Sequence, residues 1–207
     1  MVGTLPPVTT VPSPRRPLDP SDQVRRWYEN WYENELGWPT VPGSPLGLRL
    51  GVRFDVLDVP AEAGRAALRH LAPGSPVAVR GDRMRLLVAA GSAEELPGVL
   101  AWLEWGALAL DLSVTGEGGV MEAPEPAGAG AAGGRPPARG RGGTPQGAAV
   151  WLRPPEPGCE VEASLPTLSA LGGGGGAPDL VRLLGTVATQ CHRLRLRRGC
   201  AQPLAFS

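Results

Sequence analysis

Two aspartates interrupt an otherwise apolar stretch of the sequence, RFDVLDVP at residues 53–60. Burying a carboxylate in a strand is costly unless it meets a metal ion, a cation or hydrogen-bond donors. Asp55 and Asp58 are three positions apart, so on a regular strand they face opposite sides of the sheet. Only a bulge or the strand end would bring both carboxylates together. The stretch fits a metal-binding strand, the remnant of one, or an ordinary strand end.

Other residue types that often carry chemistry form no recognisable site. The three cysteines (Cys159, Cys191 and Cys200) contain no CxxC pair, and with two histidines a zinc site is not expected; free thiols in a reducing cytoplasm are the simpler interpretation. The glycine-rich stretches GTPQG, LGGGGGAP and TGEGG lack the features of phosphate-binding loops, and TGEGG predicts a hairpin turn. No serine stands in a GxSxG motif.

The composition indicates one mildly acidic domain. A chain of 207 residues is long enough for a single domain with a real core. All 20 basic residues are arginine, and the absence of lysine and isoleucine indicates a GC-rich genome rather than a function. Residues 1–123 carry 11 arginines against 15 acids, and residues 124–207 carry 9 against 5. The acidic balance of the first part argues against strong binding of a phosphate backbone, which needs clustered cations.

Low-complexity stretches set the domain limits. Residues 1–19 and 199–207 predict flexible tails around a single domain at 20–198. Residues 124–147 have almost no bulky apolar side chain to offset their ordering entropy, so they predict a disordered insertion, and LGGGGGAP predicts a second flexible break. The N-terminus lacks the apolar segment of a signal peptide, and no apolar run approaches the roughly 20 residues of a spanning helix. We expect a cytoplasmic protein without membrane contact.

The first ordered element is predicted to be an aromatic helix. Ser21 suits its N-cap and Gly37 its C-terminal stop. Its apolar face is formed by Val24, Trp27, Trp31 and Leu36, with Tyr28 and Tyr32 beside it. Aromatic side chains four positions apart could stack on nucleic-acid bases. A core face is the preferred interpretation, and the nearby glutamates also disfavour nucleic acid.

Short stretches punctuated by proline and glycine predict strands, at 38–42, 46–52, 53–59, 76–80, 84–90, 107–114, 118–124 and 148–155. Pro60 is expected at the first position of a helix over 61–71, and a short helix is expected over 97–105. A last helix over 178–198 has a buried stripe of Leu180, Leu183, Leu184, Val187 and Cys191. We therefore expect an α+β fold with a mixed or antiparallel sheet of short strands flanked by helices.

Arginines crowd the end of that last helix, namely Arg193, Arg195, Arg197 and Arg198. The helix dipole favours cations at a C-terminus, which accounts for them without any partner. A basic recognition patch is an equally good interpretation.

The order of these elements and several phrases resemble a known family. The phrases are LGWPTVP, LGVRFDVLDVPAEAGRAAL, MRLLVAAG, ALDLSVTGEGGVMEAPEP and AVWLRPP, the last followed by a helix. Together they resemble the N-terminal domain of bifunctional DNA primase–polymerases (prim-pol) of the archaeo-eukaryotic primase superfamily, in its actinobacterial type. The resemblance covers about residues 22–198 apart from the insertion. It implies a mixed α+β domain that polymerises nucleotides with two divalent metals.

The resemblance also implies site residues. The family uses an acidic pair written D-x-D or D-x-E, a histidine on a neighbouring strand and a third acid on a later strand. Asp58 matches the first acid, but the second acid's place falls on Pro60, which cannot bind metal. The histidine's place falls on Arg85, and Asp111 matches the third acid. RFDVLDVP is therefore interpreted as the remnant of a metal-binding strand.

Three hypotheses follow. The preferred one is a catalytically degenerate prim-pol-like domain that acts as a nucleotide- or nucleic-acid-binding or regulatory module, without a cofactor. The second is an active nucleotidyltransferase that holds Mg²⁺ or Mn²⁺ with Asp55, Asp58 and Asp111 and clamps the triphosphate with Arg85. In a structural site, Arg85 would instead pair with Asp58 or Asp111. The third is a protein-interaction scaffold with a protein partner and no ligand.

Overall fold

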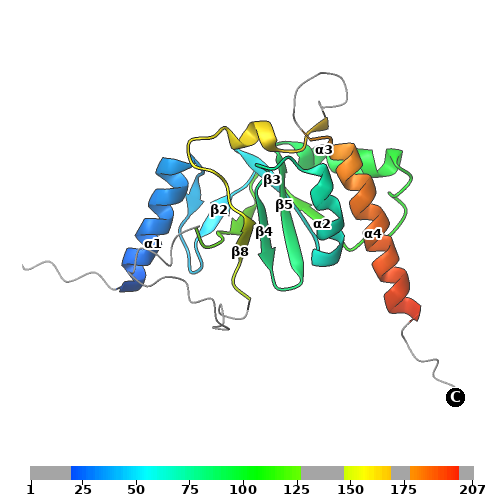
Figure 1. Ribbon diagram of the computed structural model, residues 1–207, viewed down its shortest axis with the longest axis horizontal. Coiled ribbons are helices and arrows are strands. Elements are labelled where there is room, and N and C mark those ends of the chain that lie inside the picture. Colours follow the sequence, from blue (N-terminus) through cyan, green and yellow to red (C-terminus); the bar gives the residue numbers. More distant parts are fainter. Residues whose placement is uncertain (1–19, 127–146, 169–177, 201–207) are drawn as a thin grey trace, which may run out of the picture.

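The computed structural model describes residues 20–126, 147–168 and 178–200 (Figure 1). Within these ranges the chain has an α+β fold with four α-helices and two antiparallel sheets, which confirms the expected fold class. The helices are α1 (Pro20–Asn30), α2 (Ala61–Ala67), α3 (Ser92–Trp102) and α4 (Leu180–Cys200). None of these helices is long and apolar enough to cross a membrane.

The larger sheet has five strands in the order β6–β3–β5–β4–β8. Its strands are β3 (Phe54–Pro60), β4 (Val77–Arg80), β5 (Arg83–Ala89), β6 (Ser113–Thr115) and β8 (Val150–Arg153). The smaller sheet has the order β1–β2–β7, with β1 (Thr40–Val41), β2 (Gly47–Arg49) and β7 (Val120–Glu122). The central strands β3 and β5 pair along their whole length, with Asp58 directly opposite Arg85.

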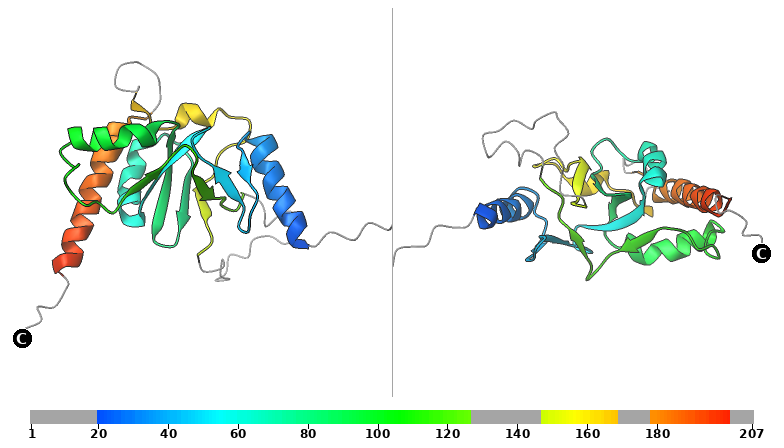
Figure 2. Two further views of the ribbon diagram at one scale, coloured as in Figure 1. Left: turned by 180° about the vertical axis from the view of Figure 1, so that it is seen from behind. Right: turned by 90° about the horizontal axis from the view of Figure 1, so that it is seen from below.

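Both faces of the five-stranded sheet carry a hydrophobic core. Successive side chains of β3 point to opposite faces, as expected of a strand. Leu57 and Val59 join a core formed with α2, α3 and α4. Phe54 and Val56 join a second core, rich in aromatic side chains, with the smaller sheet and the end of the first helix. Figures 1 and 2 show α1 at one end of the molecule and α4 at the other, with the strands between them.

The first helix is shorter than the sequence predicts. After α1 a π-helical turn (Trp31–Glu35) follows, and Gly37 then takes a left-handed conformation with φ 66°, which confirms its role as the stop. Trp31 and Tyr32 are buried, so at these two positions the core interpretation is confirmed over the base-stacking one. Val24 is 52% exposed, so the predicted apolar face is not buried at this position.

An aromatic cluster builds the second core. The ring of Trp38 lies 6.2 Å from Tyr32, 4.6 Å from Phe54 and 6.2 Å from Trp151, measured between centroids. The Tyr32 hydroxyl donates to the Pro124 carbonyl at 2.5 Å and accepts from Trp151 Nε1 at 3.0 Å. This buried hydroxyl therefore connects the end of the first helix, β8 and the chain after β7.

The predicted insertion at 124–147 begins and ends inside the described ranges. The Glu125 N–H donates to the Ala149 carbonyl at 3.3 Å, and Arg80 Nε donates to the Gly147 carbonyl at 2.9 Å. The chain therefore leaves and re-enters the described structure beside β8. Residues 127–146, residues 171–177 of the predicted glycine-rich break and the two predicted tails lie outside the described residues, except that α4 continues past the predicted domain end at 198 to Cys200.

The strands β6 and β7 correct one prediction. The sequence predicts that TGEGG joins two paired strands as a hairpin turn. The Gly119 N–H does donate to the Gly116 carbonyl at 2.9 Å, so a tight turn is present. However, β6 pairs with β3 in the larger sheet, whereas β7 pairs with β2 in the smaller one. The turn therefore carries the chain from one sheet to the other.

Two helix starts also differ from their predictions. Pro60 is the last residue of β3 and the N-cap of α2, one position earlier than expected, and a 3-10 turn (Leu68–His70) follows the helix. The helix α3 begins at Ser92 and contains Pro97, which the sequence predicts at its start. The β4–β5 hairpin around Gly81 and the buried stripe of α4 are confirmed.

Candidate functional site

A single guanidinium joins the two acids that the sequence places in one site. Arg83 Nε lies 2.5 Å from Asp58 Oδ1, and Arg83 Nη1 lies 2.6 Å from Asp111 Oδ1. Arg83 Nη2 also donates to the backbone carbonyl of Asp58 at 3.1 Å. Arg85 Nε donates to the second carboxylate oxygen of Asp58 at 3.3 Å. These four residues are called the Arg83 cluster below.

The strand register explains why these side chains meet. Asp58 on β3 faces Arg85 on β5, and Arg83 lies opposite Pro60, two residues along the same strand. Residues two apart on a strand share a face, so both arginines lie on the Asp58 side of the sheet. On the other side of β3, Asp58 pairs with Ser113 of β6, which brings Asp111 alongside the end of β3.

The end of α4 closes the cluster from the side. Arg198 Nη1 lies 3.3 Å from Asp111 Oδ2, and Arg195 Nη1 donates to the Ala109 carbonyl at 2.9 Å. The buried thiol of Cys191 lies 3.6 Å from the Asp111 carbonyl, and burial raises the pKa of this thiol to about 11. A thiol with such a pKa stays protonated at neutral pH, so Cys191 is a packing residue rather than a nucleophile.

Burial and charge both act on the cluster. The exposed fractions of the side chains are 29% for Arg83, 23% for Asp58, 14% for Arg85 and 45% for Asp111. Burial alone lowers the pKa of Arg83, but hydrogen bonds and charges from Asp58 and Asp111 outweigh it and leave the pKa raised. Arg83 therefore keeps its positive charge at every pH at which the protein is folded.

The residues of the cluster do not fit a two-metal centre. Among the described residues, no three His, Cys, Asp or Glu side chains gather closely enough to hold a metal ion. Asp58 and Asp111 are both engaged by Arg83, and the place of a second strand acid is taken by Pro60. The expected ion pair between Arg85 and Asp58 is present. A metal-binding role for Asp58 and Asp111 as a pair stays a prediction.

Asp55 lies elsewhere and has a structural partner. Its side chain is fully buried on the face of β3 opposite to Asp58, and its Oδ2 accepts a hydrogen bond of 2.9 Å from the Ala93 N–H. Gly91, the N-cap residue of α3, has no side chain that could cap the helix. The carboxylate of Asp55, on strand β3, caps it instead. Burial raises the pKa of Asp55, and backbone N–H groups at Ala93 and Gly91 oppose part of that effect. The structure therefore does not bring Asp55 together with Asp58 and Asp111.

Neither histidine joins the cluster. The His70 ring nitrogen Nε2 lies 2.8 Å from the Thr186 hydroxyl, and the His192 ring packs on Trp105 at 5.9 Å between centroids. Arg85 is among the site residues that the sequence predicts, whereas Arg83 is not. The signal for Arg83 is its position two residues before Arg85 on the same predicted hairpin, which places both side chains on the same face.

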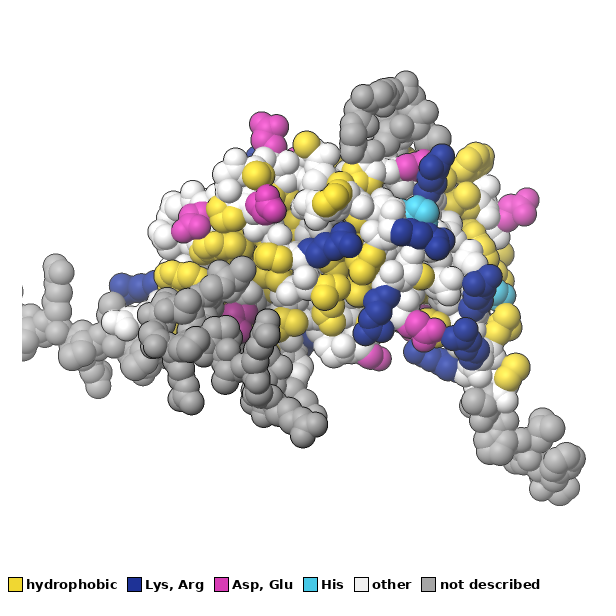
Figure 3. All heavy atoms as spheres, in the orientation of Figure 1, with side chains coloured by type: hydrophobic (Ala, Val, Ile, Leu, Met, Phe, Trp, Pro, Cys, Tyr) yellow, Lys and Arg dark blue, Asp and Glu magenta, His cyan; other side chains and the backbone are white. Residues whose placement is uncertain are grey.

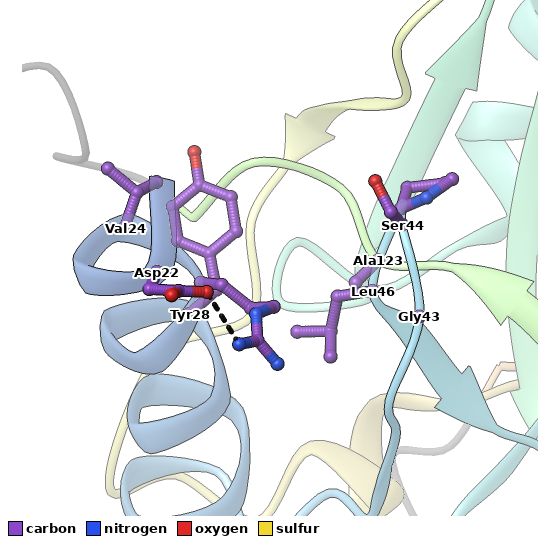
Figure 4. A pocket seen from close by; sticks show the side chains of 9 residues that line it. Asp22, Val24, Tyr28, Gly43, Ser44, Leu46 and Ala123 are labelled. Atoms are coloured by element: carbon purple, nitrogen blue, oxygen red, sulfur yellow. Dashed lines mark hydrogen bonds and ion pairs between the residues drawn. The ribbon is translucent and has the colours of Figure 1, made fainter. Parts of the chain in front are cut away.

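Two hollows lie apart from the cluster. A pocket of about 530 Å³ opens between α1 and the turn that precedes β2 (Figure 4). Tyr28 and Leu46 line it, and on its α1 side Arg25 forms a 2.8 Å ion pair with Asp22. A second, shallow groove of about 370 Å³ includes Trp102, which is 71% exposed. Neither hollow shares a lining residue with the Arg83 cluster.

Comparison with known proteins adds no assignment. No protein-family model matches the chain, and no curated protein or solved structure matches it.

Proposed function

We propose that the protein is a prim-pol-like domain that does not polymerise nucleotides and that binds the phosphates of a nucleotide or nucleic acid at the Arg83 cluster. The observation that carries the proposal is the placement of three guanidiniums, those of Arg83, Arg85 and Arg198, around two carboxylates. The positive charge exceeds the negative charge by one. An anion therefore complements the cluster better than a metal cation does.

The position of Arg83 argues against the active nucleotidyltransferase. A divalent metal at Asp58 and Asp111 would have to displace a guanidinium that holds both carboxylates at 2.5 and 2.6 Å. Charge-assisted hydrogen bonds of this kind are about twice as strong as neutral ones. Pro60 offers no ligand to replace the missing second acid. The cluster is thus in a closed, charge-paired state that does not depend on metal.

Arg85 supports the binding half of the proposal. Its Nη1 atom is buried and has no hydrogen-bond partner among the described residues. Leaving a buried charged donor unpaired is costly, and a phosphate oxygen would remove that cost. Arginine also presents several donors in one plane, which matches the geometry of a phosphate.

Calorimetric titration of a nucleoside triphosphate, with and without Mn²⁺, tests this proposal. We expect binding without metal, a loss of about tenfold or more in Arg85→Gln, and no loss in Arg49→Gln, an exposed arginine of β2 outside the cluster. A wild-type protein that binds no nucleotide would overturn the proposal. So would binding that requires Mn²⁺ and both carboxylates, or primer extension that Asp58→Ala abolishes, because these outcomes belong to an active polymerase.

A further inference from the structure

A second group of arginines lies on the outer surface of α2 and α4. Figure 3 shows basic side chains gathered in the right half of the view, over these two helices. The members of this basic face are Arg65, Arg69, Arg182, Arg193 and Arg197. All five are exposed. Two of them, Arg193 and Arg197, are among the arginines at the end of the last helix for which the sequence left two interpretations open.

The helical spacing aligns these arginines into two stripes. At 3.6 residues per turn, Arg182, Arg193 and Arg197 fall within an arc of about 60° on α4. Arg65 and Arg69 lie one turn apart on α2 and the 3-10 turn after it. Hydrogen bonds from α4 hold the stripes side by side, since Thr186 meets His70 of the 3-10 turn at 2.8 Å and Arg197 meets Glu62 of α2 at 2.8 Å.

The basic face has an excess of positive charge. Five guanidiniums are accompanied by the carboxylates of Glu62 and Asp179, which leaves an excess of three positive charges. Both ion pairs are solvent-exposed, with Arg197 at 69% and Arg182 at 78%, and such pairs hold their charges weakly. The side chains of Arg65 and Arg193 form no ion pair or hydrogen bond with any described residue. Their donors are therefore available to a partner.

The helix dipole does not account for this arrangement. Cations are favoured only near a helix C-terminus, within the last turn. Arg182 lies two residues after the start of α4, at the end where the dipole disfavours a cation, and Arg65 and Arg69 come from a different part of the chain. Since the whole chain has a net charge of zero, the positive face is balanced by acids elsewhere, such as Glu94 and Glu95 on α3.

We propose that the basic face of α2 and α4 binds the phosphate backbone of a nucleic-acid duplex. From Arg182 to Arg197 the helix rises about 22 Å, which equals about six base-pair steps of 3.4 Å. Exposed arginines spaced over such a length suit successive phosphates. The stripes contain no aromatic residue that could stack on the bases of a single strand. The proposal stands on a different surface from the Arg83 cluster and does not depend on it.

Fluorescence anisotropy with a labelled 20-base-pair DNA duplex at 50 mM and 200 mM salt tests the inference. We compare wild type with the double variant Arg65→Gln, Arg193→Gln. The control double variant, Arg26→Gln with Arg49→Gln, removes two exposed arginines whose side chains also lack described partners. Since each phosphate contact contributes about 0.9 to the slope of log affinity against log salt, the first variant should reduce the slope by about 1.8 and weaken binding at least tenfold. The control should match wild type.

Four outcomes would overturn the inference: no duplex binding at 50 mM salt, an equal loss in both double variants, tighter binding to phosphatidylserine vesicles than to the duplex, or loss of duplex binding in Arg85→Gln alone. The last outcome would mean that the duplex binds at the Arg83 cluster, and it would leave the proposed function in place. Conversely, normal duplex binding with no nucleotide binding would overturn the proposed function but support duplex binding by the basic face. Far-ultraviolet circular dichroism and thermal melting establish that each variant is folded.

Discussion

The guanidinium of Arg83 reaches across strand β3 to the carboxylate of Asp111, with 2.6 Å between Nη1 and Oδ1. In the sheet order β6–β3–β5, Arg83 belongs to β5 on one side of β3, and Asp111 lies two residues before β6 on the other side. Asp58, on β3 itself, accepts a hydrogen bond of 2.5 Å from Nε of the same guanidinium. The Arg83 side chain therefore links β5 to β3 and to the segment that precedes β6.

Arg83→Ala should destabilise the protein by about 1–3 kcal/mol, because it leaves the partly buried carboxylate of Asp58 and the exposed carboxylate of Asp111 without their shared partner. Urea denaturation measures the loss. Arg49→Ala is the control, because the exposed Arg49 side chain has no described hydrogen bond or ion pair, and it should stay within about 0.5 kcal/mol of wild type. Equal losses in the two variants would mean that Arg83 does not brace the sheet.

Asp55→Asn should remove one source of pH dependence. The pKa of Asp55 is raised in the folded state by burial, so the folded protein holds this proton to a higher pH than the unfolded chain. Stability therefore falls as the pH rises from about 4 through the folded pKa. Asn cannot ionise, so the stability of the variant relative to wild type should increase across that window in urea denaturation series. A constant difference between pH 3 and pH 8 would contradict the raised pKa.

Gly116→Ala should be destabilising by about 1–3 kcal/mol, since an added Cβ would lie 2.6 Å from the Ala93 Cβ and 3.1 Å from Asp55 Oδ1. The start of α3 would have to shift away from its capping carboxylate. Gly98→Ala, on the same helix, has nothing within 4 Å of the added Cβ and should gain up to about 1 kcal/mol from helix propensity. Thermal melting of both variants separates the two effects, and a neutral Gly116→Ala would show that the close packing can relax.

Tyr32→Phe should cost about 1–3 kcal/mol, because the buried hydroxyl serves both the Pro124 carbonyl and Trp151 Nε1. Tyr28→Phe provides the comparison. The Tyr28 hydroxyl bonds Glu125 at an exposed position, and its removal should cost less than about 1 kcal/mol. Chemical denaturation followed by tryptophan fluorescence measures both, and a larger loss in Tyr28→Phe would refute the assignment of the buried hydroxyl.

Local chemistry made part of the fold predictable. Gly37 stops the first helical run, Gly81 turns the β4–β5 hairpin, and the apolar stripe of α4 follows a 3.6-residue period. These features depend on residues close together in the sequence. The separation of β6 and β7 into two sheets does not, because nothing in TGEGG distinguishes a hairpin turn from a turn between sheets. The pairing of β6 with β3 and of β7 with β2 depends on strands that are distant in the sequence.

The site shows the same division. That Asp55 and Asp58 face opposite sides of β3 follows from strand geometry alone, and the structure confirms it. The ion pair between Arg85 and Asp58 was one of the predicted alternatives. The dominant role of Arg83 was not predicted, since it depends on the register between β3 and β5. The contact between Arg198 and Asp111 depends in addition on where α4 ends.

The hydrogen bond between Glu125 and Ala149 has a practical consequence. It holds the described residues that flank 127–146 next to each other. The entropy of closing a loop between fixed ends grows only slowly with its length. A fluorescent reporter or an affinity tag inserted within residues 127–146 should therefore be tolerated without disturbing the Arg83 cluster or the basic face.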